Sequence, residues 1–166
     1  MAYLILALVT LQRLGELWLA RRNSRALLAR GGREAGAGHY PAIVAVHALW
    51  LAALWWLAAG RGVVWPLIGL FLLLQAGRLW VLAILGRRWT TRIIVLPGEP
   101  LVTAGPFRFV RHPNYLVVAL EIAILPLAFG LWQVALLFSA LNAAVLAIRI
   151  RAEDAALARS APRAVD

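Results

Sequence analysis

The residues best suited to chemistry lie in the second half of the chain, in two groups. His112 and Tyr115 stand where a proline-rich segment enters an apolar one, and Arg149 and Glu153 follow after a second apolar segment. An arginine can bind an anion, and a carboxylate or an imidazole can accept a proton. A simpler interpretation of the first group is a helix start, because Pro113 suits the first position of a helix. The combination of both groups predicts a polar pocket at one membrane face.

Ionisable residues also occur inside the apolar segments. Glu121 lies about two helical turns into its segment and has no partner there. Arg78, which shares a helix face with Gln75, is its candidate partner from another segment. Arg13 and Glu16 are three residues apart and can neutralise each other. Hydrogen bonding between helices explains each group singly, but Glu121 and Arg78 are also candidate substrate-binding residues.

The fifth apolar segment gives the clearest geometry. Residues spaced by three and four positions share one face of a helix. One such face descends from the membrane to its edge, and it carries Ser139, Asn142, Leu146, Arg149 and Glu153. We therefore expect Arg149 and Glu153 to lie side by side where this helix leaves the lipid.

The composition is that of an integral membrane protein. Of 166 residues, 63% are hydrophobic and 14% are charged. A hydrocarbon core of about 30 Å needs roughly 20 helical residues. Five segments are expected to span it: Ala2 to Ala20, Pro41 to Ala59, Val63 to Leu85, Asn114 to Phe129 and Leu131 to Ile148. Only Gly130 separates the last two, which predicts a tight helical hairpin.

The expected fold is therefore an all-α integral membrane protein with a single domain over residues 1–166. Three spans occupy residues 1–86, a cytoplasmic loop 87–113, the hairpin 114–148, and a cytoplasmic C-terminal segment 149–166. The loop is rich in proline and glycine, and its run Arg92 to Val95 favours a short extended piece. The glycine-rich segment Gly31 to Gly38 is expected to be a flexible connection between the first two helices.

The arginines indicate the orientation in the membrane. Fourteen of the 17 fall on one side of the expected spans: Arg21, Arg22, Arg25, Arg30, Arg33, Arg87, Arg88, Arg92, Arg108, Arg111, Arg149, Arg151, Arg159 and Arg163. The positive-inside rule places that side in the cytoplasm, with the N-terminus outside the inner membrane and the C-terminus inside. Only Arg61 is expected on the outer side.

Several other classes of protein and site are not expected. The arginines flank membrane spans rather than form a soluble basic face, so a nucleic-acid partner is not expected. The chain has no cysteine, and its three histidines lack metal-ligand spacing, so no metal site is expected. The N-terminal apolar stretch lacks a basic start and a cleavage site, so we expect a retained span rather than a signal peptide.

Two sequence motifs resemble those of the isoprenylcysteine carboxyl methyltransferase family. The first runs Leu101-Val-Thr-Ala-Gly-Pro-Phe-Arg-Phe-Val-Arg-His-Pro-Asn-Tyr115, and the second is Arg149-Ile-Arg-Ala-Glu153-Asp154. The resemblance covers roughly residues 89–157. In the front half, Gln12 to Asn23, Gly38 to Pro41 and His47 are similar to a bacterial branch that methylates an oxygen of long-chain alkylpyrones and alkylresorcinols.

This resemblance implies a site for S-adenosylmethionine and an expected role for each matching residue. The cofactor is expected to contact Leu101, Val102, Gly105, Phe107, His112, Pro113, Asn114, Tyr115 and Glu153. Arg149 corresponds to the family position closest to the reacting group, so Arg149 and Glu153 are the candidate catalytic residues. The chain departs from the family pattern where Phe107 replaces a usual tyrosine, Glu99 a frequent histidine and Asp154 a second glutamate. The aromatic tail that commonly follows is absent.

The expected function is methylation of a carboxylate, phenol or enol oxygen on a lipid-tailed acceptor. A cation near that oxygen favours its anionic, nucleophilic form, and Arg149 fits this role. A phenol would also need a base, for which Glu153 and His112 are both candidates. Two alternatives stay open. A nicotinamide-dependent membrane reductase shares the Arg-His-Pro-x-Tyr element, and a small transporter or scaffold would use the intramembrane charges without catalysis.

Overall fold

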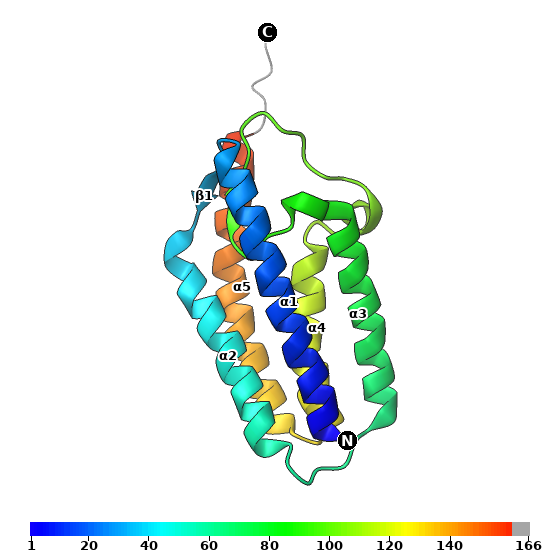
Figure 1. Ribbon diagram of the computed structural model, residues 1–166. Coiled ribbons are helices and arrows are strands. Elements are labelled where there is room, and N and C mark those ends of the chain that lie inside the picture. The colour runs from blue at the N-terminus through cyan, green and yellow to red at the C-terminus, as the bar shows by residue number, and fades with distance from the viewer. Residues whose placement is uncertain (161–166) are drawn as a thin grey trace.

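The computed structural model describes residues 1–160, which form a bundle of helices joined at one end by a long loop (Figure 1). Its elements, in chain order, are α1 (Ala2–Ala29), β1 (Arg33–Ala35), η1 (Ala37–His39), α2 (Tyr40–Leu57), α3 (Trp65–Leu85), η2 (Gly86–Arg88), β2 (Ile93–Val95), η3 (Gly105–Arg108), α4 (Pro113–Ala128) and α5 (Trp132–Ser160). Arg163 and the rest of the expected C-terminal segment beyond residue 160 lie outside the described residues.

The all-α membrane fold is confirmed. Four helices are long and apolar enough to cross a membrane, and α4 is a shorter apolar helix of 16 residues. Helix α4 begins at Pro113, as expected, and turns sharply into α5 through Phe129 to Leu131. A carbonyl at the end of α4 accepts the hydrogen bonds that close this turn, from the backbone N–H groups of Phe129 and Leu131 to Pro126 O.

Two helices run further than the apolar segments predict. Helix α1 continues to Ala29 rather than Ala20, and α5 continues to Ser160 rather than Ile148. The added turns are rich in arginine, alanine and leucine, which favour helices, and no glycine or proline interrupts them. Hydropathy marks where a helix leaves the lipid, whereas helix propensity determines where it ends. The expected C-terminal segment is therefore a continuation of α5, as far as the structure describes it.

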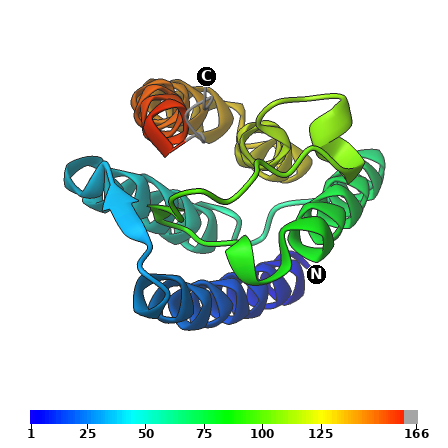
Figure 2. The same cartoon turned by 90° about the horizontal axis from the view of Figure 1, so that it is seen from above.

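The expected flexible connection between α1 and α2 is instead partly ordered. Residues Arg33–Ala35 form β1, which pairs antiparallel with β2, so that Glu34 lies opposite Ile94. The β-branched run Ile93–Val95 was expected to be extended, and this is confirmed. The two-stranded ribbon connects the end of α1 to the long loop. Figure 2 shows it crossing the end of the bundle above α2.

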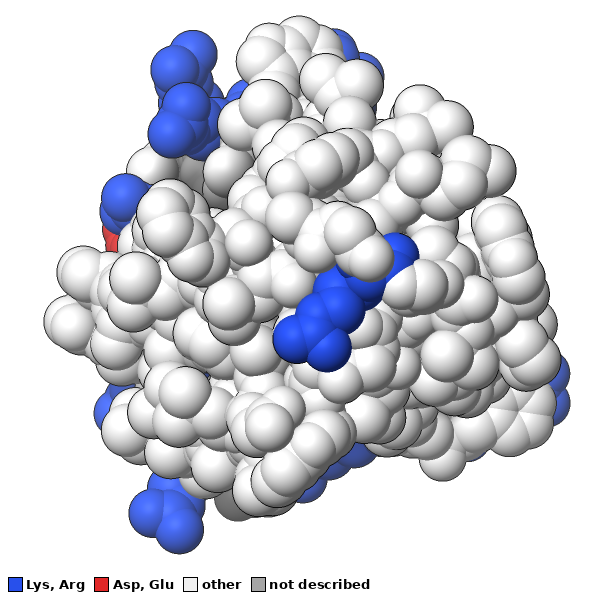
Figure 3. Space-filling model, turned by 90° about the horizontal axis from the view of Figure 1, so that it is seen from below, with Lys and Arg blue, Asp and Glu red and all other residues white. Residues whose placement is uncertain are grey.

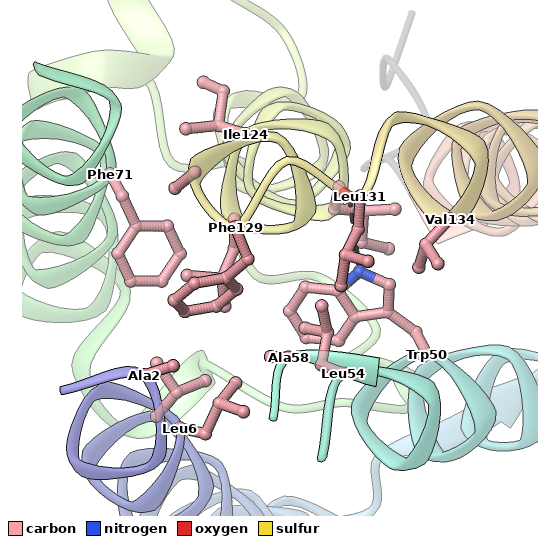
Figure 4. Packing of buried hydrophobic residues seen from close by; sticks show 14 of the residues in the cluster. Ala2, Leu6, Trp50, Leu54, Ala58, Phe71, Ile124, Phe129, Leu131 and Val134 are labelled. Atoms are coloured by element: carbon pink, nitrogen blue, oxygen red, sulfur yellow. Dashed lines mark hydrogen bonds between the residues drawn. The ribbon is translucent and has the colours of Figure 1, made fainter. Parts of the chain in front are cut away.

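An apolar core fills the end of the bundle that is opposite the ribbon (Figure 4). Leu6 of α1, Leu54 of α2 and Leu125 of α4 are completely buried there. Trp50 joins them and donates its indole N–H to the carbonyl of Ile122 at 3.2 Å. Viewed from this end, the molecular surface is largely uncharged (Figure 3). The outer faces of the helices expose leucine and tryptophan side chains, as lipid contact requires.

A cluster of ion pairs lies between α1, α3 and α4. The carboxylate of Glu121 is 1% exposed and accepts hydrogen bonds from Arg78 Nε at 3.0 Å and Arg13 Nη2 at 2.9 Å. Glu16 accepts from Arg13 Nη1 at 2.8 Å and from Arg78 Nη1 at 3.1 Å. The two arginines and two glutamates sum to no net charge. The expected contacts of Arg78 with Glu121 and of Arg13 with Glu16 are both confirmed.

Two glutamine side chains complete this cluster. Gln75 donates to Glu121 Oε1 at 2.6 Å and accepts from Gln12 Nε2 at 2.6 Å. Apart from this cluster, the backbone of α1 approaches α3 and α4 at few points, whereas α4 packs closely against both α3 and α5. The polar side chains therefore help to hold α1 against α3 and α4, together with apolar packing of Leu6 and Ala20.

A close approach of the loop to α3 depends on Gly105. Its φ is +58°, in the left-handed region that favours glycine, and a Cβ there would lie 2.7 Å from Ile84 Cγ1. This contact seats η3 on the end of α3. Gly98 in the same loop also has a positive φ, of +79°, but a Cβ there would meet open space.

We expect Glu121→Ala to lower the free energy of unfolding by about 3–5 kcal/mol, because the buried guanidinium of Arg78 and the partly buried one of Arg13 lose a carboxylate. Denaturant unfolding of the purified protein in detergent measures this change. Leu120→Ala, next in the chain and exposed on the outer face of α4, is the matched control and should cost less than about 1 kcal/mol. Equal losses in the two variants would contradict a stabilising role for the cluster.

We expect Gly105→Ala to destabilise the protein by about 1–3 kcal/mol more than Gly98→Ala does. Both substitutions carry the cost of a left-handed alanine, so their difference isolates the contact with Ile84. Melting temperatures of the two variants, measured side by side in detergent, provide the comparison. A Gly98→Ala protein that melts at or below the Gly105→Ala protein would show that the contact is unimportant.

Candidate active site

Three side chains form a hydrogen-bonded chain where α4 begins beside α5. Arg149 donates from Nε to the hydroxyl oxygen of Tyr115 at 2.8 Å, and this hydroxyl donates to Glu153 Oε2 at 2.5 Å. The guanidinium of Arg149 also lies over the Tyr115 ring, 5.4 Å from its centroid. Arg149 and Glu153 are one helical turn apart on α5, as the spacing predicts. Tyr115 contacts both residues from the first turn of α4, which begins at Pro113.

His112 supports this chain from the residue before α4. Its ring stacks on that of Tyr115, with the centroids 5.3 Å apart. Its Nδ1 lies 3.5 Å from Glu153 Oε2, and its Nε2 lies 3.2 Å from Asp154 Oδ1. The substitution of Asp154 for the second glutamate of the family pattern therefore leaves an acidic partner for His112.

A first cavity of about 490 Å³ lies between the long loop, the start of α4 and the C-terminal half of α5. This volume falls within the range of about 300–1,000 Å³ that small-molecule sites occupy. The sequence-predicted residues that line it are Leu101, Val102, Phe107, His112, Pro113, Asn114, Tyr115, Arg149 and Glu153. Gly105 does not line the cavity, but it seats η3, which carries Phe107 into the wall.

Glu99 ties the loop that covers this cavity to two other elements. Its Oε1 accepts from Nη2 of Arg30, the residue that follows α1, at 2.5 Å, and its Oε2 accepts from Arg88 of η2. Arg88 also donates to the carbonyl of Pro100 at 2.8 Å. The glutamate that stands in place of a frequent histidine therefore anchors the loop between two arginines.

A second cavity of about 290 Å³ lies on the other side of the same residues, between α1 and α2. Its wall includes Arg13, Arg78 and His47 among mainly apolar side chains. Leu14 and Val44 belong to this wall and are also exposed on the outer faces of their helices, so the cavity reaches the lipid-facing surface. The residues shared by both cavities are Trp89, Thr90, Asn114, Tyr115 and Arg149.

Two polar atoms at this shared boundary lack a protein partner. The indole N–H of Trp89 and the amide oxygen of Asn114 are buried and make no hydrogen bond within residues 1–160. Trp89 is 3% exposed, and Asn23 of α1 fixes its position by donating to the Trp89 carbonyl at 2.8 Å. Buried polar groups are normally paired, because an unpaired one costs about 1–3 kcal/mol. A donor and an acceptor are thus free for a ligand at the boundary.

Of the three predicted substrate-binding residues, Arg149 lines both cavities, and the other two have different positions. Arg78 lines the second cavity, whereas Glu121 lines neither and binds Arg78 and Arg13. Sequence reasoning missed the residues of α1 and α2 that complete the second cavity. The signal was present in α2, where Tyr40, Val44, His47 and Leu51 follow steps of three and four and therefore share one face. Trp89 carried no comparable signal.

Comparison with known proteins agrees with these motifs. Residues 67–159 match the sequence profile described as the "Isoprenylcysteine carboxyl methyltransferase (ICMT) family". The chain is also 38% identical over 170 residues to "Uncharacterized protein YpbQ" of Bacillus subtilis (strain 168), covering 95% of this chain and 96% of that protein. No solved structure matches the chain significantly. The chain belongs to the isoprenylcysteine carboxyl methyltransferase family.

Proposed function

We propose that this protein transfers a methyl group from S-adenosylmethionine to an oxygen of a lipid-tailed acceptor. The observation that carries the proposal is the meeting of two cavities at Arg149 and Tyr115. A transfer reaction needs two reactants held within about 3–3.5 Å of each other. One cavity lies under the polar loop and the other reaches the lipid-facing surface, so a water-soluble reactant and a lipid can approach the same point from different sides.

The first cavity fits S-adenosylmethionine by its chemistry. Phe107 and the aliphatic side chains of the loop offer apolar contact, and Glu153 offers a carboxylate to polar groups of the cofactor. The unpaired atoms of Trp89 and Asn114 add one donor and one acceptor at the inner wall. When bound, S-adenosylmethionine supplies a methyl group on a sulfonium, which an oxygen nucleophile takes by in-line displacement. The residues of the loop and of α5 would hold it and exclude water.

Arg149 is the residue we assign to the acceptor oxygen. Its Nε donates a hydrogen bond to the Tyr115 hydroxyl, but neither Nη atom donates to a protein group within the described chain. These donors are on the wall of both cavities, and the guanidinium is 6% exposed, where its charge is weakly screened. Arg149 would therefore stabilise an anionic oxygen, and an acceptor carboxylate would need nothing more. For a phenol or enol, Glu153 or His112 would accept the proton.

The acceptor is proposed to enter from the membrane between α1 and α2, past Leu14 and Val44. A long-chain alkylpyrone or alkylresorcinol is a compatible acceptor, because its tail suits the lipid and its oxygens suit the polar boundary. The arginines of the loop end support an orientation with this end in the cytoplasm, the N-terminus outside and the protein in the cell membrane. The charged cofactor would then arrive directly from the cytoplasm.

The proposed reaction is tested by incubating membranes that contain the protein with methyl-labelled S-adenosylmethionine. We expect label in a lipid that is absent from membranes without the protein, and mass spectrometry of the extract identifies the acceptor. Isothermal titration of the purified protein with S-adenosylmethionine and with reduced nicotinamide cofactors accompanies the assay. Binding of a reduced nicotinamide but not of S-adenosylmethionine would favour the reductase alternative and overturn the proposal.

We expect Arg149→Gln to lower kcat/KM for methyl transfer by about 10²–10³-fold, because the anionic acceptor loses a charged hydrogen-bond partner that binds and orients it. Arg149→Lys keeps the positive charge but loses the planar guanidinium with its fixed donors. The activity of this variant should therefore lie between that of the wild-type protein and that of Arg149→Gln. Arg151→Gln removes the same charge from an exposed position on α5 and should change activity little. Full activity in a folded Arg149→Gln protein, checked by its melting temperature, would rule out the assigned role.

A further inference from the structure

Four consecutive residues at the end of η3 and just after it, Arg108 to Arg111, are exposed. Phe109 is 77% exposed and Val110 is 39% exposed, and an arginine flanks this pair on each side. The backbone N–H groups of Phe109 and Val110 both donate to the carbonyl of Pro106, at 3.2 and 3.1 Å, so the conformation is fixed. This segment, which we call the outer turn, presents an apolar pair rimmed by charge, as surfaces that contact membranes do.

The outer turn lies at the level where α3 leaves the hydrocarbon. Helix α3 has 21 residues, or roughly 31 Å of helix, which matches a hydrocarbon core of about 30 Å. Gly105, at the start of η3, is seated against Ile84 and Trp80 in the last two turns of α3. Figure 2 shows this part of the loop at the outer edge of the bundle. The outer turn follows within a few residues and therefore lies beside the end of the span.

The apolar pair continues the lipid-facing surface of the neighbouring helices. Leu79 and Trp80 of α3 are exposed, and so is Leu116 in the first turn of α4. Tryptophan is enriched at the boundary between acyl chains and headgroups, and long arginine side chains near that boundary extend toward the headgroups. Phe109 and Val110 are therefore at the depth of this boundary, with arginines able to reach outward from it.

The charges of the outer turn indicate the kind of lipid. Arg108 makes no hydrogen bond or ion pair within residues 1–160. Arg111 has a long contact, from Nη2 to Asp154 Oδ1 at 3.5 Å, and its side chain is exposed, so this pair contributes little. Both guanidinium groups are available to a phosphate, which arginine binds with two parallel hydrogen bonds. A leaflet that contains anionic phospholipid attracts each such arginine.

The outer turn is connected directly to the wall of the first cavity. Phe107 precedes the turn and His112 follows it, and both line that cavity, whereas Phe109 and Val110 do not. The turn therefore has lipid on one side and the cavity wall on the other. Its position determines where Phe107 and His112 stand.

We propose that the outer turn inserts into the headgroup layer on the loop side of the membrane and binds anionic phospholipid there. This anchoring holds the wall of the first cavity in place for S-adenosylmethionine. The insertion itself is independent of what fills the cavity. The effect on the cofactor rests on the proposed function, because it takes S-adenosylmethionine as the occupant.

Insertion is measured with a spin label at position 110 in protein reconstituted into vesicles. The chain has no cysteine, so Val110→Cys provides a single labelling site. Relaxation of the label by oxygen, which concentrates in lipid, and by a neutral nickel chelate, which stays in water, gives its depth. Leu72→Cys, exposed in the middle of α3, is the lipid reference, and Pro97→Cys, exposed in the long loop, is the water reference.

We expect the label at position 110 to lie between the two references in vesicles of equal parts phosphatidylcholine and phosphatidylglycerol. In phosphatidylcholine alone it should move toward the water reference, and Arg108→Gln should reduce the difference between the two vesicles. A label as accessible to the nickel chelate as the one at position 97 overturns insertion. Equal depth in both vesicles, or replacement of phosphatidylglycerol by added inorganic phosphate, overturns the assignment to anionic lipid.

The effect on the cavity is measured as the dissociation constant of S-adenosylmethionine for the unlabelled protein. Anionic vesicles concentrate this cationic compound at their surface, so variants are compared within one kind of vesicle. We expect Arg108→Gln to bind it about 3-fold to 5-fold more weakly than the wild-type protein in the anionic vesicles, and equally in phosphatidylcholine. Arg111 lines the cavity itself and is therefore left unchanged.

Arg159→Gln is the matched control, because it removes the same charge from an exposed position on α5. Arg159 lies ten residues beyond Arg149, or roughly 15 Å of helix, which exceeds a Debye length of about 8 Å. Its affinity for S-adenosylmethionine should match that of the wild-type protein in both vesicles. Melting temperatures check that every variant is folded.

Two further outcomes separate this inference from the proposed function. A folded Arg108→Gln protein that binds S-adenosylmethionine like the wild-type protein in anionic vesicles overturns the effect of anchoring on the cavity. Absence of S-adenosylmethionine binding in every vesicle would instead count against the proposed function, and the depth of the label at position 110 would still decide whether the outer turn is inserted.

Discussion

The ion cluster of Arg13, Glu16, Arg78 and Glu121 is the constraint on which the arrangement of the bundle depends. Arg78 and Glu121 are buried and Arg13 and Glu16 partly buried among apolar helices, where charges are tolerated only when they are paired. Removal of any one leaves its partner with a large desolvation cost. Each helix that contributes is therefore held in one register relative to the others. For α1, whose backbone approaches α3 and α4 at few points, these pairs add to the apolar packing of Leu6 and Ala20.

This way of holding α1 has a structural consequence for the site. A helix packed by ridges and grooves closes the space beside it, whereas a helix held by long polar side chains stands further off. The second cavity lies beside α1, with Arg13 and Arg78 on its wall and exposed leucines at its margin. Residues of the cluster that stabilises the bundle thus also form part of the wall of a space that reaches the lipid.

The helices and the first cavity could be predicted from the sequence because their signals are local. Apolar runs predict spans, and the motif from Leu101 to Tyr115 brings most of a cavity wall within one loop and one helix start. The long-range features could not be predicted in this way. The strand β1 has only three residues in a glycine-rich stretch, and its partner lies in a distant loop. Likewise, no short motif joins His47 to Arg13, so the second cavity depends on tertiary packing alone.

The boundary between the two cavities brings these local and long-range features together. Tyr115 and Asn114 belong to the local motif, whereas Trp89 is held by Asn23 of α1, the helix that also contributes Arg13 and Glu16 to the ion cluster. Arg149 projects from α5 into the same boundary and is fixed there by Tyr115. A change in the register of α1 would therefore move one wall of the site while the motif residues keep their places. The position of α1 thus bears on the meeting of the two cavities as directly as the motif does.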